Sequence, residues 1–279
     1  MKVLVTGGGG RLGRALVRRR GDAEVVALDR AALDVCDPDA LARALDVHAP
    51  AAVVNAAAYT AVDRAEAERD RAFTVNALGA GHVARACAAR GVALVHVSTD
   101  HVFDGTATRP YREDDRVAPR SVYGASKAAG EDAVRAAGGR VVRTSWLFGE
   151  DGAGFVPAIA ARLRTGGAVR VVDDQRGCPT WVDDLAGALL ALVRLRDAPD
   201  VVHFAGDEST TWHGLAVAIA LLLGVDPSQV EAIGSEAWGA SAPRPAYAVL
   251  DTERARRLGL APRSWRPGLR HVLSAGARG

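Results

Sequence analysis

A short apolar run that ends in a glycine-rich turn most constrains the fold of this chain. Residues 2–6 have β-strand character and are followed by Gly7, Gly10 and Gly13 and then by a helical pattern. This order is the setting of a dinucleotide fingerprint, in which amides at a helix N-terminus face a pyrophosphate. The spacing here is Gly7-x-x-Gly10-x-x-Gly13 rather than Gly-x-Gly-x-x-Gly. A flexible turn with no ligand could have the same glycine content. Its place between strand and helix favours cofactor binding.

Strand-like and helix-like segments alternate up to about residue 150. The predicted strands are 2–6, 24–28, 51–55, 92–97 and 140–144, and the helices between them include one at 38–47, capped by Asp37, and a long one at 67–90. Repeated β-α order implies a parallel sheet with right-handed crossovers. We predict an α/β protein with a Rossmann-type doubly wound sheet. Residues 1–150 would bind NAD(P) and carry the catalytic residues, and 151–279 would mainly form a smaller α/β lobe for substrate, with some segments returning to the sheet.

Asp29 and Arg30 follow the second predicted strand, where the adenine ribose should lie. A carboxylate there accepts from the 2′-hydroxyl of NAD, and an arginine pairs with the 2′-phosphate of NADP. Both residues are present, and either could also be a solvated charge. The sequence therefore predicts NADPH or NADH as cofactor, with NADPH slightly favoured.

Tyr123 and Lys127 stand four residues apart in a segment of helical composition, so both side chains leave one helical face. The ordinary pKa of a tyrosine, about 10, is too high for an acid or base at neutral pH. We expect the Lys127 ammonium and a cationic nicotinamide to lower it, which makes this pair a device for proton transfer. The chain has 35 lysine and arginine residues, of which only Lys2 and Lys127 are lysines. A Tyr-x-x-x-Lys pattern also arises by chance, so the motifs around it decide whether a catalytic role is justified.

Small and polar residues follow two further strands. The run 56–60, which includes Ala58 and Tyr59, would let a flat ring or a ribose approach the backbone, although it could equally reflect tight packing. Thr99 comes at the carboxyl end of the fourth strand, where chemistry occurs in open α/β sheets. Its hydroxyl could donate to a substrate carbonyl oxygen or cap the loop. Asn76, in the long helix, could be buried facing this region.

Composition narrows the classes of protein. A net charge of +2 with dispersed arginines does not suggest a nucleic-acid partner. Three cysteines without metal-ligand spacing indicate reduced thiols, and no signal peptide or membrane-length apolar run is present. We expect a soluble cytoplasmic protein with no membrane partner; if it self-associates, a homodimer is the default expectation.

An ordered set of motifs resembles the dTDP-4-dehydrorhamnose reductase family of the extended short-chain dehydrogenase/reductases, nearly from end to end. The motifs are Thr6-Gly7 to Gly13, 55–63, 75–77, Ser98-Thr99-Asp100 to Gly105, Tyr123 to Lys127 with Gly130-Glu131, 143–146, 174–180, Arg244-Pro245, 250–252 and Trp265. The family reduces the 4-keto group of a dTDP-6-deoxyhexulose. The resemblance therefore implies an NAD(P)H-dependent nucleotide-sugar 4-ketoreductase.

The resemblance also implies roles. Tyr123 would protonate the C4 oxygen as hydride arrives, Lys127 would hold the nicotinamide ribose and tune Tyr123, and Thr99 would bind the carbonyl oxygen. The predicted cofactor-binding residues are Gly7, Gly10, Arg11, Leu12, Gly13, Asp29, Arg30, Asp34, Val35, Ala58, Tyr59, Tyr123 and Lys127. The predicted substrate-binding residues are Thr99, Asp100, His101, Trp146 and Arg244, the last near the diphosphate.

The chain departs from the family at His101, where tyrosine is usual, and this leaves open both the exact sugar and whether His101 contacts it. Some members are described with magnesium, but no acidic cluster is found, so no metal is predicted. Two alternatives remain: a nucleotide-sugar epimerase or dehydratase of the same superfamily, and a non-catalytic NADP-binding regulatory subunit. A dehydratase is disfavoured because Asp100 precedes His101 rather than a glutamate. A regulatory subunit would not need intact Thr99, Tyr123 and Lys127.

Overall fold

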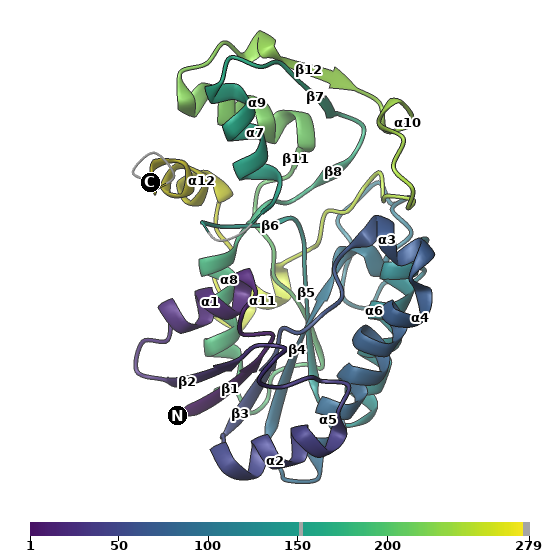
Figure 1. The fold of residues 1–279 in the computed structure, drawn as a ribbon, viewed down its shortest axis with the longest axis vertical. Coiled ribbons are helices and arrows are strands. Elements are labelled where there is room, and N and C mark those ends of the chain that lie inside the picture. The colour runs from purple at the N-terminus through teal and green to yellow at the C-terminus, as the bar shows by residue number, and fades with distance from the viewer. Residues whose placement is uncertain (151–152, 276–279) are drawn as a thin grey trace.

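A computed structural model describes residues 1–150 and 153–275 of the chain (Figure 1). In this part, six parallel strands form one central sheet in the order β10-β5-β4-β3-β1-β2. Their bounds are β1 Lys2–Thr6, β2 Glu24–Leu28, β3 Ala52–Asn55, β4 Ala93–Thr99, β5 Arg140–Thr144 and β10 Val201–His203. The predicted α/β fold with a Rossmann-type parallel sheet is confirmed. β10 comes from the second half of the chain.

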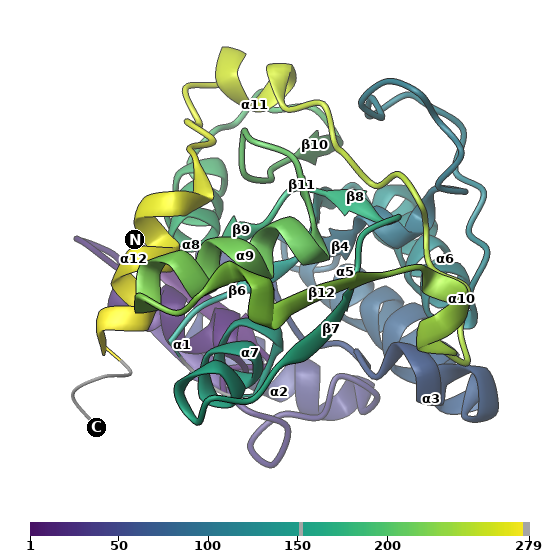
Figure 2. The ribbon, with the colours of Figure 1, turned by 90° about the horizontal axis from the view of Figure 1, so that it is seen from above.

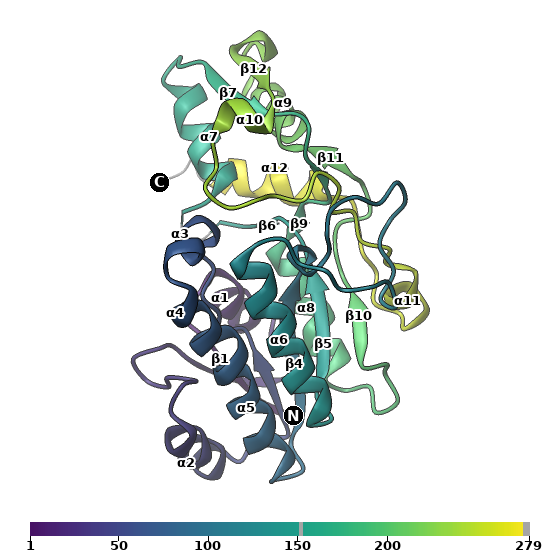
Figure 3. The ribbon, with the colours of Figure 1, turned by 90° about the vertical axis from the view of Figure 1, so that its right-hand side faces the viewer.

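Helices cover both faces of the sheet because each presents an apolar side to it (Figure 3). On one face α1 packs against α8, where Leu12 and Leu16 join the same buried cluster as Leu185 and Leu189. The other face is covered by α2, α5 and α6. The bounds are α1 Arg11–Arg18, α2 Pro38–His48, α5 Ala80–Ala88, α6 Val122–Ala136 and α8 Val182–Leu192.

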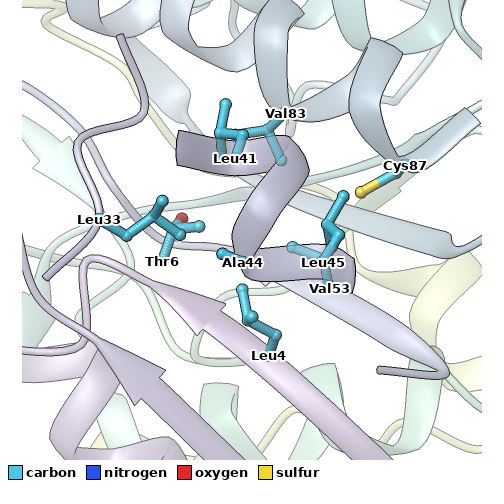
Figure 4. A pocket seen from close by; sticks show the side chains of 9 residues that line it. All are labelled: Leu4, Thr6, Leu33, Leu41, Ala44, Leu45, Val53, Val83 and Cys87. Carbon is cyan, nitrogen blue, oxygen red and sulfur yellow. The ribbon is translucent and has the colours of Figure 1, made fainter. Parts of the chain in front are cut away.

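Figure 4 shows the apolar contact between α2, α5 and the sheet at close range. The nine side chains leave no space for a water molecule, so this is packed core and not a binding site. The residues are Leu4, Thr6, Leu33, Leu41, Ala44, Leu45, Val53, Val83 and Cys87. The start of α2 follows the prediction, since Asp37 accepts from the amides of Asp39 and Ala40.

The long helix predicted at 67–90 is wrong in detail. The structure divides it into α4 Arg69–Phe73, a π-helical segment η1 Thr74–Gly79, and α5. Within η1 the buried Asn76 side chain accepts from the amide of Tyr59 and donates to the Tyr59 carbonyl and to Ser126. These bonds join the segment after β3 to α6, and π-turns often occur beside functional sites. The hydrophobic pattern could not reveal this widened turn because its 6 residues are too few to show a period different from that of an α-helix.

The second half of the chain builds a lobe with its own apolar core over one end of the sheet (Figure 2). Its main elements are α7 Phe155–Arg164, β7 Val169–Val172, α9 Trp212–Leu223, β12 Val230–Ile233 and α12 Trp265–Ala275, and β12 pairs in parallel with β7. The remaining short elements, which are distributed over both halves of the chain, are α3 Val62–Ala67, η2 Asp100–Val102, β6 Leu147–Phe148, β8 Arg176–Gly177, β9 Thr180–Trp181, β11 Thr210–Thr211, η3 Pro227–Gln229, α10 Ser235–Trp238 and α11 Glu253–Arg257. Among residues 1–150 and 153–275, no helix is both long and apolar enough to cross a membrane.

Candidate active site

A cavity of about 1210 Å³ lies between the carboxyl ends of the strands and the lobe. Open α/β sheets bind their ligands at this edge. The predicted residues that line it are Gly7, Gly10, Arg11, Leu12, Gly13, Asp29, Arg30, Ala58, Thr99, Asp100, His101, Tyr123, Lys127, Trp146 and Arg244. The fold therefore brings together residues that are far apart in the sequence.

The glycine turn fits a bound dinucleotide for a steric reason. Gly7 has φ +70°, and a Cβ there would lie 2.8 Å from the backbone of Ala57, in the segment that follows β3. A Cβ on Gly13 would lie 2.5 Å from the carbonyl oxygen of Gly8. Glycine at these positions lets the turn fold tightly onto the sheet and brings the N-terminus of α1, whose cap is Gly10, to the cavity. An anionic phosphate group is the ligand that such a helix end favours.

Three predicted cofactor residues lie away from the lining of the cavity as the described residues define it. Asp34 accepts from the amide of Cys36 and lies 3.7 Å from Arg30. Val35 is buried in the core beneath α5, and the Tyr59 hydroxyl donates to Glu68. Asp29 and Arg30 do line the cavity. Cofactor contacts by Asp34, Val35 and Tyr59 stay predictions.

Helix α6 carries Tyr123 and Lys127 and is held close to its neighbours by two glycines. Ser121 caps the helix by accepting from the amide of Gly124. A Cβ on Gly124 would lie 2.2 Å from the carbonyl oxygen of His101, and one on Gly130 would lie 2.1 Å from that of Asn76. Small residues at these two points allow α6 to bring both side chains to the edge of the sheet.

The expectation that the pKa of Tyr123 lies below its ordinary value is wrong. Burial raises it to about 12, because removing the phenolate from water outweighs the favourable bond with Thr99, and Asp100 raises it further. Tyr123 therefore keeps its proton at neutral pH, which is the state that a proton donor needs.

Lys127 is almost fully buried, and burial lowers its pKa to about 8. Its Nζ donates to the carbonyl oxygen of Val97 at 2.6 Å and lies 3.1 Å from Nε2 of His96. A lysine with such a pKa can exchange a proton near neutral pH. His96 is a buried neighbour of Lys127 that no sequence motif had singled out.

Thr99 and Asp100 form a coupled pair at the end of β4. The Thr99 hydroxyl donates to Oδ1 of Asp100 at 2.8 Å and accepts from the amide of His101. Burial raises the pKa of Asp100 to about 7. Because a threonine has one hydrogen, Thr99 cannot donate to an Asp100 carboxylate and to a substrate carbonyl at once.

Four of the six buried side-chain polar atoms that find no partner among the described residues line this cavity. They are Ser98 Oγ, Asp100 Oδ2, His101 Nδ1 and Thr144 Oγ1. Buried polar groups are normally hydrogen-bonded, so these four indicate a polar ligand or water. His101 also meets the ring of Tyr123 edge to face, with centroids 5.4 Å apart.

The lobe contributes an aromatic wall. Trp146, at φ +45°, stacks on Trp212 with ring centroids 3.7 Å apart, and Phe155 meets Trp212 at 4.7 Å. Arg244 forms an ion pair with Asp63 of α3 at 2.6 Å. That pairing leaves Arg244 at the cavity wall but with its charge already partly balanced.

Sequence reasoning missed several lining residues of the lobe, namely Phe155, Trp212 and Trp238, and it gave no role to Gln175. Gln175 stood within the recognised motif 174–180, which was the available signal. Trp212 and Trp238 belonged to no recognised motif, so the sequence offered no clear signal for them. Among the described residues, no group of three or more His, Cys, Asp or Glu side chains is placed to hold a metal ion.

The parallel sheet, the glycine turn at its switch point and the Tyr123–Lys127 pair beside Thr99 define a nucleotide-dependent oxidoreductase of the short-chain dehydrogenase/reductase type. Residues 1–277 match the model of the family described as RmlD substrate binding domain. The chain belongs to this family, which confirms the resemblance inferred from the sequence motifs.

Named relatives agree along nearly the whole chain. It is 46% identical to the probable dTDP-4,6-dihydroxy-2-methyloxan-3-one 4-ketoreductase of Streptomyces antibioticus, over 98% of this chain and 95% of the relative. It is also 46% identical to the dTDP-4-dehydrorhamnose reductase of Streptomyces griseus, over 98% and 93%. The crystal structure of dTDP-4-dehydrorhamnose reductase from Bacillus anthracis in complex with NADP superposes with a TM-score of 0.93 at 33% identity, over 98% of this chain and 99% of that one.

Proposed function

We propose that this chain reduces the 4-keto group of a dTDP-4-dehydro-6-deoxyhexose to the hydroxyl, with NADPH or NADH as hydride donor. The observation that carries this proposal is the convergence of Thr99, Tyr123 and Lys127 on one cavity with the glycine turn. The names of the similar reductases support the substrate class. The unpartnered polar atoms of the cavity suit a sugar rich in hydroxyl groups.

The residues have separate tasks in this reaction. The nicotinamide, when bound, supplies the hydride for C4. Tyr123, protonated at neutral pH, gives its proton to the C4 oxygen. Thr99 donates a hydrogen bond to the same oxygen as negative charge develops on it. With Asp100 in its neutral form, the acid donates to Thr99 Oγ1, and the Thr99 hydrogen is then available to the substrate.

The glycine turn would hold the pyrophosphate, and Asp29 and Arg30 would meet the adenine ribose. The Arg30 side chain is 71% exposed, and its ion pair with Asp34 is long, at 3.7 Å, and therefore weak. Arg30 can thus turn toward a 2′-phosphate at small cost in free energy. This favours NADPH, while Asp29 leaves room for NADH. Trp146 and His101 would lie beside the sugar, and Arg244 would lie near the diphosphate.

The direct test is oxidation of NADPH and of NADH by the purified protein with freshly prepared dTDP-4-keto-6-deoxyhexoses, with the products identified by NMR. We expect turnover with at least one of them and a 4-hydroxy product. Absence of turnover with all of them, with the cofactor still bound, would reject the proposal. A protein that purifies with stoichiometric NAD⁺ would instead support an epimerase or dehydratase.

A further inference from the structure

A chain of buried hydrogen bonds runs behind Lys127 through the middle of the sheet. The Thr6 hydroxyl lies 2.6 Å from Oδ1 of Asn55, and Nδ2 of Asn55 lies 3.0 Å from Nδ1 of His96. Nε2 of His96 lies 3.1 Å from Nζ of Lys127. The four residues come from β1, β3, β4 and α6, and each is at most 2% exposed. Of these four residues, only Lys127 is among the predicted catalytic residues.

The two hydrogen bonds that the side-chain oxygen of Asn55 accepts determine the orientation of its amide group. Oδ1 accepts from the Thr6 hydroxyl and, at 3.3 Å, from the backbone amide of Ala57, which can only donate. Nδ2 therefore faces His96 and donates to Nδ1. A neutral imidazole has one N–H and one acceptor nitrogen, so the proton of His96 is on Nε2.

This tautomer directs a donor at Lys127. An ammonium has three donors and no acceptor, whereas a neutral amine has a lone pair. The Nε2–H of His96 can therefore be accepted by Lys127 only when the lysine is neutral. Nζ still has hydrogens for the carbonyl oxygen of Val97. We propose that His96 is a positioning residue that stabilises the neutral amine of Lys127 through its Nε2–H, with its tautomer set by Asn55.

The charges around the pair are consistent with this arrangement. Burial and the nearby Lys127 hold the pKa of His96 well below its usual value, so the imidazole stays neutral. Glu131, one turn further along α6, raises the pKa of Lys127, but burial lowers it more. Glu131 is itself bound by Arg143 at 2.7 Å, which reduces its effect.

The inference deepens the proposed function, on which its catalytic consequence depends. When Tyr123 gives its proton to the C4 oxygen, a phenolate remains. Lys127 can restore the phenol: one N–H bond of the ammonium breaks, the tyrosine O–H bond forms, and a neutral amine is left. His96 stabilises that amine until the solvent returns a proton. Removing His96 should therefore change the protonation equilibrium of Lys127 rather than only the packing.

The lysine content makes a direct measurement simple. Because only Lys2 and Lys127 are lysines, a protein grown with [ε-¹³C]lysine gives two side-chain signals, and Lys2→Arg assigns them. We expect the pKa of Lys127 to be about one pH unit higher, or more, in His96→Phe, because the donor to the neutral amine is gone. An unchanged or lower pKa would overturn the inference, since a lower value means that His96 accepts from the ammonium. The Lys2 signal is the internal control.

A second measurement requires no variant, in case His96→Phe does not fold. The ¹⁵N shifts of the histidine ring in the unaltered protein report which nitrogen carries the proton, and His96 can be assigned by its through-space contacts to Val97 and Lys127. A protonated Nε2 and a bare Nδ1 are expected. A protonated Nδ1 would refute the inference. Neither measurement uses a substrate, so its result is independent of whether the chain reduces a ketosugar.

Discussion

The indole of Trp146 stacks on the indole of Trp212 with ring centroids 3.7 Å apart and planes within 8° of parallel. This contact joins the segment after β5 to the first residue of α9 and forms part of the cavity wall. Trp146 has φ +45°, a region that bulky residues rarely adopt. Such a conformation persists only where the surroundings enforce it, and it is common at ligand sites. The Trp146 indole also lies against Gly177.

Gly177→Ala should displace this wall. An added Cβ would lie 2.5 Å from the Trp146 indole, which is already stacked against Trp212. We expect KM for the sugar nucleotide to rise about tenfold, equivalent to about 1.4 kcal/mol of lost binding, with little change in cofactor affinity. Steady-state kinetics and cofactor titration measure the two effects. Gly187→Ala on α8 is the matched control, since apart from the adjacent backbone of its own helix no atom lies within 4 Å of its added Cβ; equal effects of both variants would contradict the prediction.

Tyr123→Phe should abolish proton donation and leave the cavity intact. We expect kcat to fall by about 10²–10⁴-fold, the usual contribution of a positioned acid, with cofactor binding retained. Single-turnover kinetics and a cofactor titration check this. Tyr247→Phe is the control, because Tyr247 lies outside the lining of the cavity as the described residues define it. Near-normal turnover by Tyr123→Phe would contradict the prediction and assign the proton donation to another group.

The raised pKa of Asp100 predicts a loss of activity above neutral pH. Its pKa is raised to about 7, so above that pH its carboxylate captures the single hydrogen of Thr99. We expect kcat/KM to fall as the pH rises through about 7. In Asp100→Asn the amide donates to Thr99 permanently, so this fall should disappear. A pH profile of the variant that still declines near 7 would assign the decline to another group.

Arg30→Ala should change cofactor choice. The side chain is 71% exposed, and its ion pair with Asp34 at 3.7 Å contributes little to stability. We expect affinity for NADPH to fall about tenfold, since a charge-assisted bond to the 2′-phosphate is lost, and affinity for NADH to stay the same. Fluorescence titrations with both cofactors measure this. Parallel losses for the two cofactors would place Arg30 elsewhere than at the 2′-position.

The lowered pKa of His203 predicts that the protein loses stability in acid. Burial, with Arg143 nearby, lowers its pKa to about 3, whereas the unfolded chain takes up the proton near the ordinary value of 6.5. Between these values the unfolded state binds more protons, so the free energy of unfolding decreases as the pH falls through this window. In His203→Gln the slope of stability against pH should be shallower there, by denaturant titration at several pH values. An unchanged slope would mean that other buried groups control the acid response.

The local sequence determined most of the elements and the residues of the cofactor edge. Regular apolar runs bounded by Gly7 and Asp37 identify strand and helix ends, because turn and cap chemistry depends on neighbours in the chain. The same local logic placed Thr99 at a strand end and Tyr123 with Lys127 on one helical face. Family motifs extended this to Trp146 and Arg244.

Tertiary structure alone decided what those residues meet. The pKa of Tyr123 rises instead of falling because burial, which no local pattern reveals, outweighs the bond with Thr99 that lowers it. The pairing of Lys127 with His96 and Asn55 depends on two neighbouring strands and a helix, and the stack of Trp146 on Trp212 depends on a lobe that folds back over the sheet. Hydrogen bonds, desolvation and ring contacts act through space, so the sequence supplied the chemical groups and the fold set their protonation and their partners.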